Sequence, residues 1–236
     1  MNYLFMKDVF RAFGFEVTKN RNLRISLYQA ICHLKMLGFK PNVIVDAGVA
    51  SGTPAIYKNF PHTKTILVEP LIEYKEYIDR ILLRYPDFIY LQQAISDKCG
   101  SIEFYLKDTL SGSSEYLAND ETTAKRIAID SITLEQIVEQ YKITSPALLK
   151  LDIEGSEKKV LLANPDSVKR FDVIICEVTF IPKLNNAPSF SDINAILTDL
   201  DYCVFDIVDL RYYRKSHNLF QSDVVFIKNN SWLRLM

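Results

Sequence analysis

The sequence predicts an α/β protein: a Rossmann-like, doubly wound, mostly parallel seven-stranded sheet with an antiparallel last strand and an N-terminal helical extension. Apolar runs typical of strands alternate with helical patterns, which favours parallel strands joined by helices. Some of these runs, such as "DVIICEV" at 172–178, are almost continuously apolar. Such runs are typical of a sheet that is covered on both faces.

Residues 1–40 are predicted to form an N-terminal helical cap. Apolar side chains recur every three or four positions over Phe5–Phe13 and again over Leu23–Leu34, which indicates two amphipathic helices. Gly38 supplies a C-cap for the second helix, and Pro41 closes the segment.

Residues 41–236 are predicted to form the main domain. Helices are expected over 53–61, where Pro54 suits the first turn, and over 71–86. The seven strands are expected, in chain order, at 42–48, 63–70, 87–96, 146–155, 171–178, 202–210 and 222–229.

An insertion of about residues 97–145 separates the third strand from the fourth. We expect strands over 100–107 and 125–133 and a helix over 133–141. Between them, "DTLSGSSEYLANDE" at 108–121 is polar. Long polar loops in compact domains are often functional, so we expect this one to act as a lid.

Composition excludes several classes of protein. The 236 residues carry 28 basic and 29 acidic side chains, whereas nucleic-acid-binding proteins usually show a basic excess. The four cysteines lie far apart without a CxxC pair, which argues against a zinc site or a disulfide framework. Charges interrupt the first apolar stretch, and no run approaches the length of a membrane span. We therefore expect a cytoplasmic protein without a membrane span and without a nucleic-acid partner.

Acidic residues stand at or near the carboxyl ends of four predicted strands. They are Asp46, Glu69, Asp152 and Glu177. Ligands of doubly wound sheets bind outside these strand ends, at the switch in strand order. Since buried carboxylates need partners, this shared position indicates that the site lies at this edge of the sheet.

The stretch "VIVDAGVASG" ends the first strand in two glycines, Gly48 and Gly52. Glycines allow a tight turn, and we expect a cofactor to lie against their bare backbone. Glu69 follows Gly48 by 21 positions (69 − 48), which suits an acid that binds the two hydroxyls of a ribose. The pocket should therefore hold an adenosine without a 2′-phosphate.

The same turn favours S-adenosylmethionine over NAD or FAD. The middle glycine of the dinucleotide turn is missing, and Asp46 would repel a pyrophosphate. A negative charge suits a ligand that carries an ammonium and a sulfonium.

At this point the sequence resembles the FkbM-type family of S-adenosylmethionine-dependent methyltransferases. The resemblance covers roughly residues 41–228, and the first 40 residues carry no part of it. Val49 and Ala50 depart from the alanine and asparagine that are usual in the family's turn. The stretches that carry the resemblance are "VIVDAGVASG", "ILVEP", "QAISDKCGSIEFY", "DSITLEQIV", "LLKLDIEGSEKKVL" and "FDVIICEV".

The resemblance implies a Rossmann-like methyltransferase that acts on a hydroxyl oxygen of a sugar or biosynthetic intermediate. It places Glu69 at the ribose, Ala94 and Asp97 beside the adenine, and Asp152 near the amino or sulfonium end. The residues implied at the methionine end are Asp46, Gly48, Ser51 and Gly52.

An alcohol acceptor also needs a general base. The candidates are Glu154, Glu177 and His217, the last in a loop before the final strand. We assign no metal ligand. The alternative is that Asp152, Glu154 and Glu177 hold Mg²⁺, which prefers carboxylate and water oxygens.

The predicted function is O-methylation of a glycan or a small biosynthetic intermediate, with S-adenosylmethionine as cofactor. The stretch "RYYRK" at 211–215 could contact an anionic acceptor, or it could be a solvated basic loop. A homodimer is possible, through the N-terminal helices. Two alternatives stay open: an NAD-dependent oxidoreductase or epimerase, and a non-catalytic cofactor-binding module.

Overall fold

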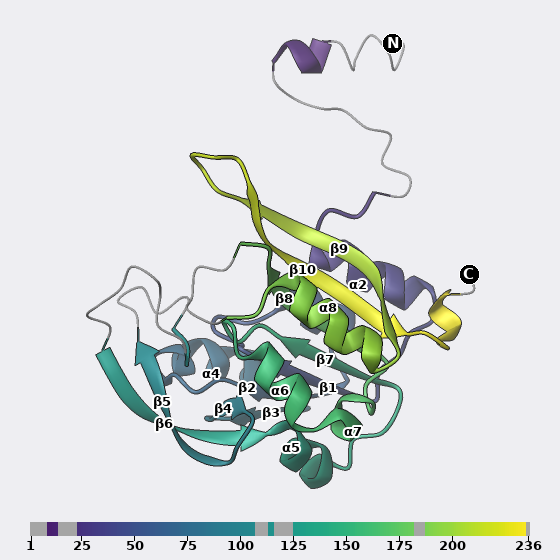
Figure 1. The fold of residues 1–236 in the computed structure, drawn as a ribbon. Coiled ribbons are helices and arrows are strands. Elements are labelled where there is room, and N and C mark those ends of the chain that lie inside the picture. Colours follow the sequence, from purple (N-terminus) through teal and green to yellow (C-terminus); the bar gives the residue numbers. More distant parts are fainter. Residues whose placement is uncertain (1–8, 14–22, 107–112, 116–124, 182–186, 235–236) are drawn as a thin grey trace.

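The computed structural model describes residues 9–13, 23–106, 113–115, 125–181, 187–234. Its main sheet confirms the predicted fold (Figure 1): seven strands in the order β3-β2-β1-β7-β8-β10-β9. β10 runs antiparallel to both of its neighbours, β8 and β9, and the other neighbouring strands of this sheet pair in parallel. The strands are β1 (Val43–Ala47), β2 (Lys64–Val68), β3 (Phe88–Leu91), β7 (Ala147–Leu151), β8 (Val173–Thr179), β9 (Tyr202–Tyr212) and β10 (Leu219–Lys228).

Helices cover both faces of this sheet, and each face has its own apolar core. One face packs against α2 (Leu27–Met36), α3 (Pro54–Asn59) and α4 (Lys75–Arg84). The other face packs against α5 (Leu134–Tyr141), α6 (Glu157–Ala163), α7 (Pro165–Val168) and α8 (Phe190–Asp199). Two short 3₁₀ turns, η1 (Ile72–Tyr74) and η2 (Trp232–Arg234), complete the described elements.

The predicted strand over 87–96 is wrong as a single strand. It splits after Leu91: β3 pairs with β2, while β4 (Ala94–Ser96) pairs with β6 (Lys125–Thr133) of the insertion. Together with β5 (Gly100–Leu106), β4 and β6 form a separate three-stranded sheet. The backbone of Ala94–Ser96 thus finds its partners in the insertion, which the local sequence pattern cannot show.

The N-terminal segment is described only in part. Residues 9–12 are helical, but most of the first predicted helix lies outside the described residues. The second is α2, which buries Leu27, Ile31 and Leu34 in the same core as β1 and α3. The division at residue 40 stays a prediction.

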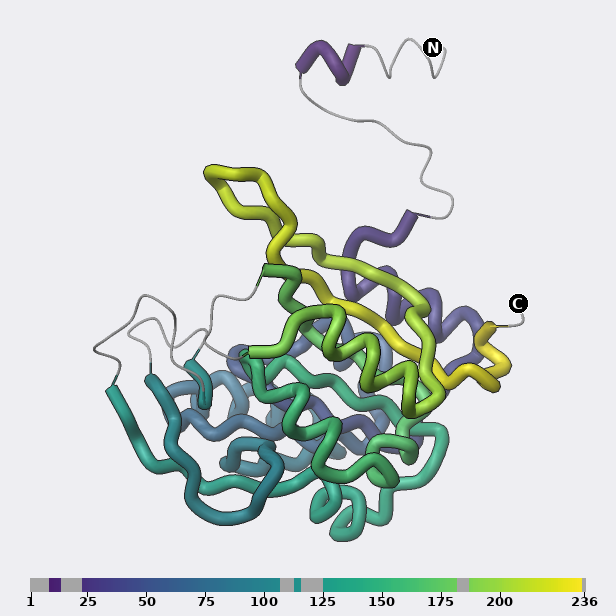
Figure 2. The backbone as a smooth tube through the Cα atoms, in the orientation of Figure 1, coloured from purple at the N-terminus to yellow at the C-terminus, as the bar shows by residue number. Residues whose placement is uncertain are grey.

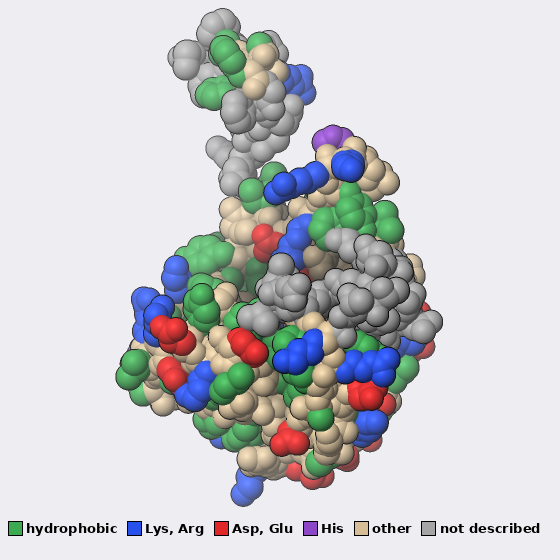
Figure 3. Space-filling view, turned by 90° about the vertical axis from the view of Figure 1, so that its left-hand side faces the viewer, with side chains coloured by type: hydrophobic (Ala, Val, Ile, Leu, Met, Phe, Trp, Pro, Cys, Tyr) green, Lys and Arg blue, Asp and Glu red, His purple; other side chains and the backbone are tan. Residues whose placement is uncertain are grey.

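The strands β9 and β10 extend past the ends of their neighbours as a hairpin, which Figure 2 shows clearly. Over the face seen in Figure 3, Lys and Arg side chains are interspersed with Asp and Glu, in keeping with the near-zero net charge. No helix in the described ranges has the length and apolar composition needed to cross a bilayer.

Candidate active site

A cavity of about 240 Å³ opens at the carboxyl edge of the main sheet, between the ends of its strands and the three-stranded sheet. We call it the glutamate pocket. Apolar side chains from Leu71, Ile95 and Phe104 form one part of its wall, and carboxylates form another. Its lining residues are Gly48, Ala50, Val68, Glu69, Pro70, Leu71, Tyr74, Ala94, Ile95, Phe104, Ser113, Glu115, Asp152, Ile153, Glu154, Ser156, Glu177 and Arg211.

Glu69 directly follows β2 and is held at the pocket wall by two backbone groups. The N–H of Ala50 donates to one carboxylate oxygen at 2.9 Å, and the N–H of Leu71 donates to the other at 3.0 Å. Each oxygen has two lone pairs, so each can accept a further hydrogen bond from a ligand. Burial raises the pKa of this carboxyl, against the effect of the two N–H groups.

Gly48 is needed for a reason that the sequence analysis did not anticipate. Its φ is +77°, and a Cβ at this position would lie 1.7 Å from the carbonyl oxygen of Asp152. At Gly52, where φ is +106°, a Cβ would lie 2.7 Å from Cδ1 of Ile81. The bare backbone at both glycines therefore accommodates the protein's own chain, although Gly48 also lines the pocket.

Asp46 is fully buried beneath the glycine turn. The hydroxyl of Tyr57 donates to one oxygen at 2.5 Å, and Nζ of Lys150 lies 3.5 Å from the other. Lys150 also forms an ion pair with Asp152 at 3.1 Å. Asp46 does not line the glutamate pocket, and Lys150 links it to Asp152, which does.

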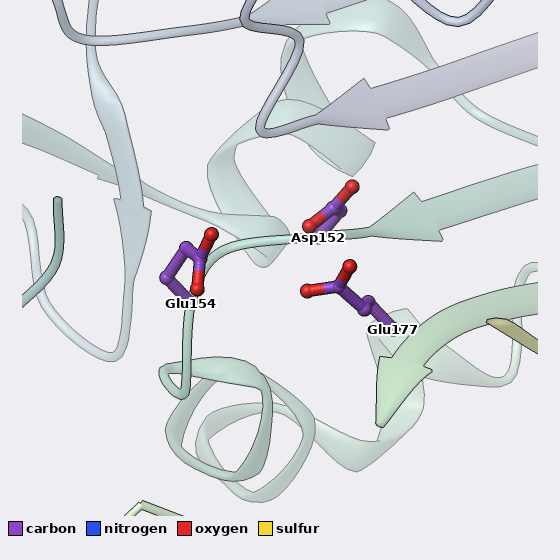
Figure 4. Close-up of side chains that lie close together, drawn as sticks. All are labelled: Asp152, Glu154 and Glu177. Carbon is purple, nitrogen blue, oxygen red and sulfur yellow. The ribbon is translucent and has the colours of Figure 1, made fainter. Parts of the chain in front are cut away.

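Three carboxylates converge at the far end of the pocket (Figure 4). Asp152 and Glu154 come from the segment after β7, and Glu177 comes from the end of β8. Each offers one oxygen, and these oxygens lie within 4.8 Å of one another. Glu154 has a φ of +52° and precedes Gly155 at +99°, so a tight left-handed turn directs this segment back across the strand end.

Glu177 is clamped by two strands of the hairpin. Arg211 of β9 donates to one of its oxygens at 2.5 Å, and Gln221 of β10 donates to the other at 2.6 Å. Burial raises the pKa of Glu177, as do the charges of Asp152 and Glu154, while Arg211 lowers it. The carboxylates are thus packed closely enough that one of them favours binding a proton or another cation.

The other predicted site residues lie in different places. Ala94 lines the glutamate pocket, whereas Asp97 accepts a hydrogen bond from Ser96 at 3.1 Å and does not line it. Ser51 and Gly52 line a second cavity on the other side of the glycine turn. His217, exposed in the β9–β10 hairpin with a φ of +56°, lines neither cavity.

Two charged residues of the pocket were not among the predicted site residues. Glu115 lies in the insertion and accepts hydrogen bonds from Ser96 at 2.9 Å and Ser156 at 3.1 Å. The second is Arg211, which the sequence analysis considered only within "RYYRK", as a contact to an anionic acceptor or as part of a solvated basic loop. Neither stands at the end of a parallel strand, so strand-end position could not reveal them.

The fold and the pocket define a Rossmann-like protein with a cavity at the switch in strand order, where β1 and β7 lie side by side and the chain continues outward in opposite directions. A family model described as "Methyltransferase FkbM domain" matches residues 45–204. The chain therefore belongs to the FkbM methyltransferase family, which confirms the resemblance and favours a methyltransferase over an NAD-dependent enzyme. No curated protein matches the chain.

Solved structures of methyltransferases are similar at low identity. A putative methyltransferase from Streptococcus mutans in complex with SAH is 11% identical, with a TM-score of 0.48, covering 87% of this chain and 99% of that one. Magnesium protoporphyrin IX methyltransferase from Synechocystis PCC 6803 with bound SAM is 10% identical, with a TM-score of 0.45, covering 97% and 100%. These likenesses carry no information on the acceptor.

Proposed function

We propose that this protein transfers the methyl group of S-adenosylmethionine to a hydroxyl oxygen of a glycan or a small biosynthetic intermediate. The observation that carries the proposal is Glu69, whose carboxylate is fixed at the pocket wall by Ala50 and Leu71 and keeps lone pairs for a ribose diol. The carboxylate cluster lies in the same pocket, where an acceptor would meet the methyl group.

The described residues fit the cofactor's nucleoside. Leu71, Ile95 and Phe104 offer apolar contacts to a purine ring, and Ala94 lies beside them. Glu69 suits the two ribose hydroxyls, and its charge disfavours a 2′-phosphate. Glu115 and Ser113 place polar atoms in the same wall.

When bound, S-adenosylmethionine supplies an already activated methyl group. The protein's part is to hold the acceptor oxygen in line with that methyl group, which can be worth about 7–11 kcal/mol. As the new C–O bond forms, the methyl C–S bond would break to leave S-adenosylhomocysteine, and the hydroxyl proton would pass to a base. We propose that Glu154 or Glu177, which both line the pocket, accepts it, whereas His217 lies outside the lining.

Cofactor binding is tested by calorimetry with S-adenosylhomocysteine. We expect the wild-type protein to bind it, and Glu69→Ala to weaken the affinity by about 10-fold or more, because hydrogen bonds to a charged group are lost. Glu73→Ala removes a neighbouring acid that does not line the pocket and should bind like wild type. If the wild-type protein does not bind S-adenosylhomocysteine, the proposal fails.

The base is tested by Glu154→Gln and Glu177→Gln, assayed with labelled cofactor and a cell extract as the source of acceptor. We expect at least one variant to lose methyl transfer by about 10²-fold or more while still binding S-adenosylhomocysteine. His217→Gln should keep the wild-type rate. Wild-type rates in both glutamate variants would show that neither carboxylate is the base.

A magnesium ion at Asp152, Glu154 and Glu177 stays an alternative to the metal-free site that we expect. The same assay decides it, since a metal-dependent enzyme would lose activity in EDTA and regain it with Mg²⁺.

A further inference from the structure

The β9–β10 hairpin stands beside the glutamate pocket and extends past the ends of its neighbouring strands (Figure 2). Arg211 of β9 lines the pocket. The backbone N–H of Phe180, just after β8, donates to the carbonyl oxygen of Phe220 in β10 at 2.8 Å. The hairpin is therefore joined at its base to the strand that carries Glu177, and its tip, residues 213–218, continues outward from the wall that Arg211 forms.

The hairpin tip is braced by its own contacts. The N–H of His217 donates to the carbonyl oxygen of Tyr213 at 2.9 Å, and the N–H of Tyr213 donates to that of Asn218, also at 2.9 Å. The rings of Tyr213 and Phe220 pack with their centroids 4.6 Å apart. The side chains of the tip are thus presented from a hydrogen-bonded turn.

The hairpin carries positive charge without negative charge beside it in the chain. No Asp or Glu stands between Asp209 and Asp223, whereas the whole protein has a net charge of −1. Arg211, Arg214 and Lys215 all fall in this interval. Arg214 and Lys215 are exposed, and within the part of the chain that the structure describes neither has an ion-pair partner. Such a local excess of positive charge attracts anions.

Arg211 keeps hydrogen-bond donors for a ligand. Its Nη1 donates to Glu177 at 2.5 Å and to Gln221 at 2.8 Å. A guanidinium has five N–H groups in a planar fork, and no contact among the described residues uses those on Nη2 and Nε. This fork matches the oxygens of a phosphate, which can accept two parallel hydrogen bonds from it.

The rest of the pocket disfavours an anion. Among the lining residues that the structure describes, five are acidic and Arg211 is the one cation. The acidic ones are Glu69, Glu115, Asp152, Glu154 and Glu177. They admit an uncharged hydroxyl but repel an anionic group. An acceptor that carries both would place its hydroxyl near the carboxylates and its anionic group at Arg211 and the hairpin.

We propose that the acceptor carries a phosphate group, which is bound by Arg211, Arg214 and Lys215 of the hairpin. The inference rests on the proposed function, because it names the class of acceptor for the same site. A phosphate monoester has close to two negative charges and three acceptor oxygens, which suits three cations better than a carboxylate does. The group is a monoester, as in a sugar phosphate, or the diphosphate of a nucleotide-linked sugar. It orients the acceptor and takes no part in the transfer of the methyl group.

The test is calorimetry on protein saturated with S-adenosylhomocysteine. Inorganic phosphate stands in for a monoester, and inorganic pyrophosphate for a diphosphate. We expect the wild type to bind at least one of them, and the double variant Arg214→Gln/Lys215→Gln to weaken that binding by about 10-fold, because hydrogen bonds between charged groups are lost. Arg211→Lys keeps a charge beside Glu177 but loses the planar fork, and should weaken the same probe. The double variant should bind S-adenosylhomocysteine like wild type.

Lys169→Gln/Arg170→Gln is the matched control. It removes the same two charges from exposed positions shortly before β8, at the opposite edge of the sheet from the pocket, and should bind both probes like wild type. The proposal is overturned if the wild type binds neither probe, or if the hairpin variant and the control bind them equally. It is also overturned if the hairpin variant loses only binding to phosphatidylglycerol vesicles, since the hairpin would then be a membrane contact. Binding of S-adenosylhomocysteine would in each case leave the proposed function standing, whereas a wild type that does not bind it refutes the function itself.

Discussion

At the scale of single residues, Glu157 shows how the acidic residues of the site affect the stability of the folded protein. It begins α6, and its side chain is buried. The N–H of Ile153 donates to its carboxylate at 3.0 Å. Burial, together with the charges of Asp152 and Glu154, nevertheless raises its pKa to about 8.

This raised pKa makes stability depend on pH. In the unfolded chain the carboxyl loses its proton near its ordinary pKa of about 4.3, while the folded protein retains it up to about pH 8. The free energy of unfolding should therefore fall as pH rises between these values, by about 1.4 kcal/mol for each unit of difference in pKa.

Glu157→Gln keeps an acceptor for Ile153 but cannot ionise. We expect its unfolding free energy in urea to fall less than that of wild type between pH 5 and pH 8. Glu135→Gln is the matched control, because Glu135 occupies the first turn of α5 but is exposed. Parallel pH profiles for wild type and Glu157→Gln would contradict the account.

Individual site residues were predictable where chain spacing fixes their place. Glu69 could be predicted because one helix and one strand, α3 and β2, separate it from the glycine turn. In a strand-helix-strand unit this spacing puts the residue at the carboxyl end of the second strand, beside the turn. The buried pairing of Asp46 with Tyr57 and Lys150 could not, since it depends on how α3 and β7 pack. Arg211 comes from β9 and reaches Glu177 of β8 across β10, a pairing that depends on the strand order and not on chain spacing.

At the scale of elements, the backbone of the turn after β1 packs directly against the backbone that follows β7, and we call this contact the crossing. The N–H of Asp152 donates to Ala47 at 3.1 Å, and the crossing leaves no room for a Cβ at Gly48. The turn after β1 contacts Asp152 on one side, and on the other its Ala50 N–H donates to Glu69. Both acids line the same pocket, so the packing of this turn shapes the site.

Gly48→Ala should therefore be severely destabilising, with a loss above about 4 kcal/mol of unfolding free energy. Gly100→Ala is the matched control: its φ is +109°, but nothing lies within 4 Å of a Cβ there. Strain alone should cost that variant about 1–3 kcal/mol. Equal urea midpoints of unfolding for the two variants would show that contact with the Asp152 carbonyl is not what requires a glycine at position 48.

Elements with a strong local pattern were predictable, and those defined by distant partners were not. Strands such as β7 and β8 are mostly apolar, interrupted by Lys150 and Glu177, and α5 has a Thr133–Gln136 capping box. The split between β3 and β4 depends on pairing with β6 about 40 residues later. The helix α8 was not predicted, although Ser189 and Asp192 form a capping box at its start.

At the scale of the whole molecule, strand order creates the site. Because the chain proceeds from β1 to β3 on one side and continues from β7 on the other, the ends of β1, β2, β7 and β8 meet around one crevice. The four strand-end acids were predicted to gather there. Glu69, Asp152 and Glu177 line the same pocket, while Asp46 lies beneath it.

The most direct test of this account is a crystal structure of the protein with S-adenosylhomocysteine. We predict that the two ribose hydroxyls lie within hydrogen-bonding distance of the Glu69 carboxylate, with the purine against Leu71 and Phe104. A nucleoside bound elsewhere, or a Glu69 side chain turned away from the ribose, would contradict the central claim.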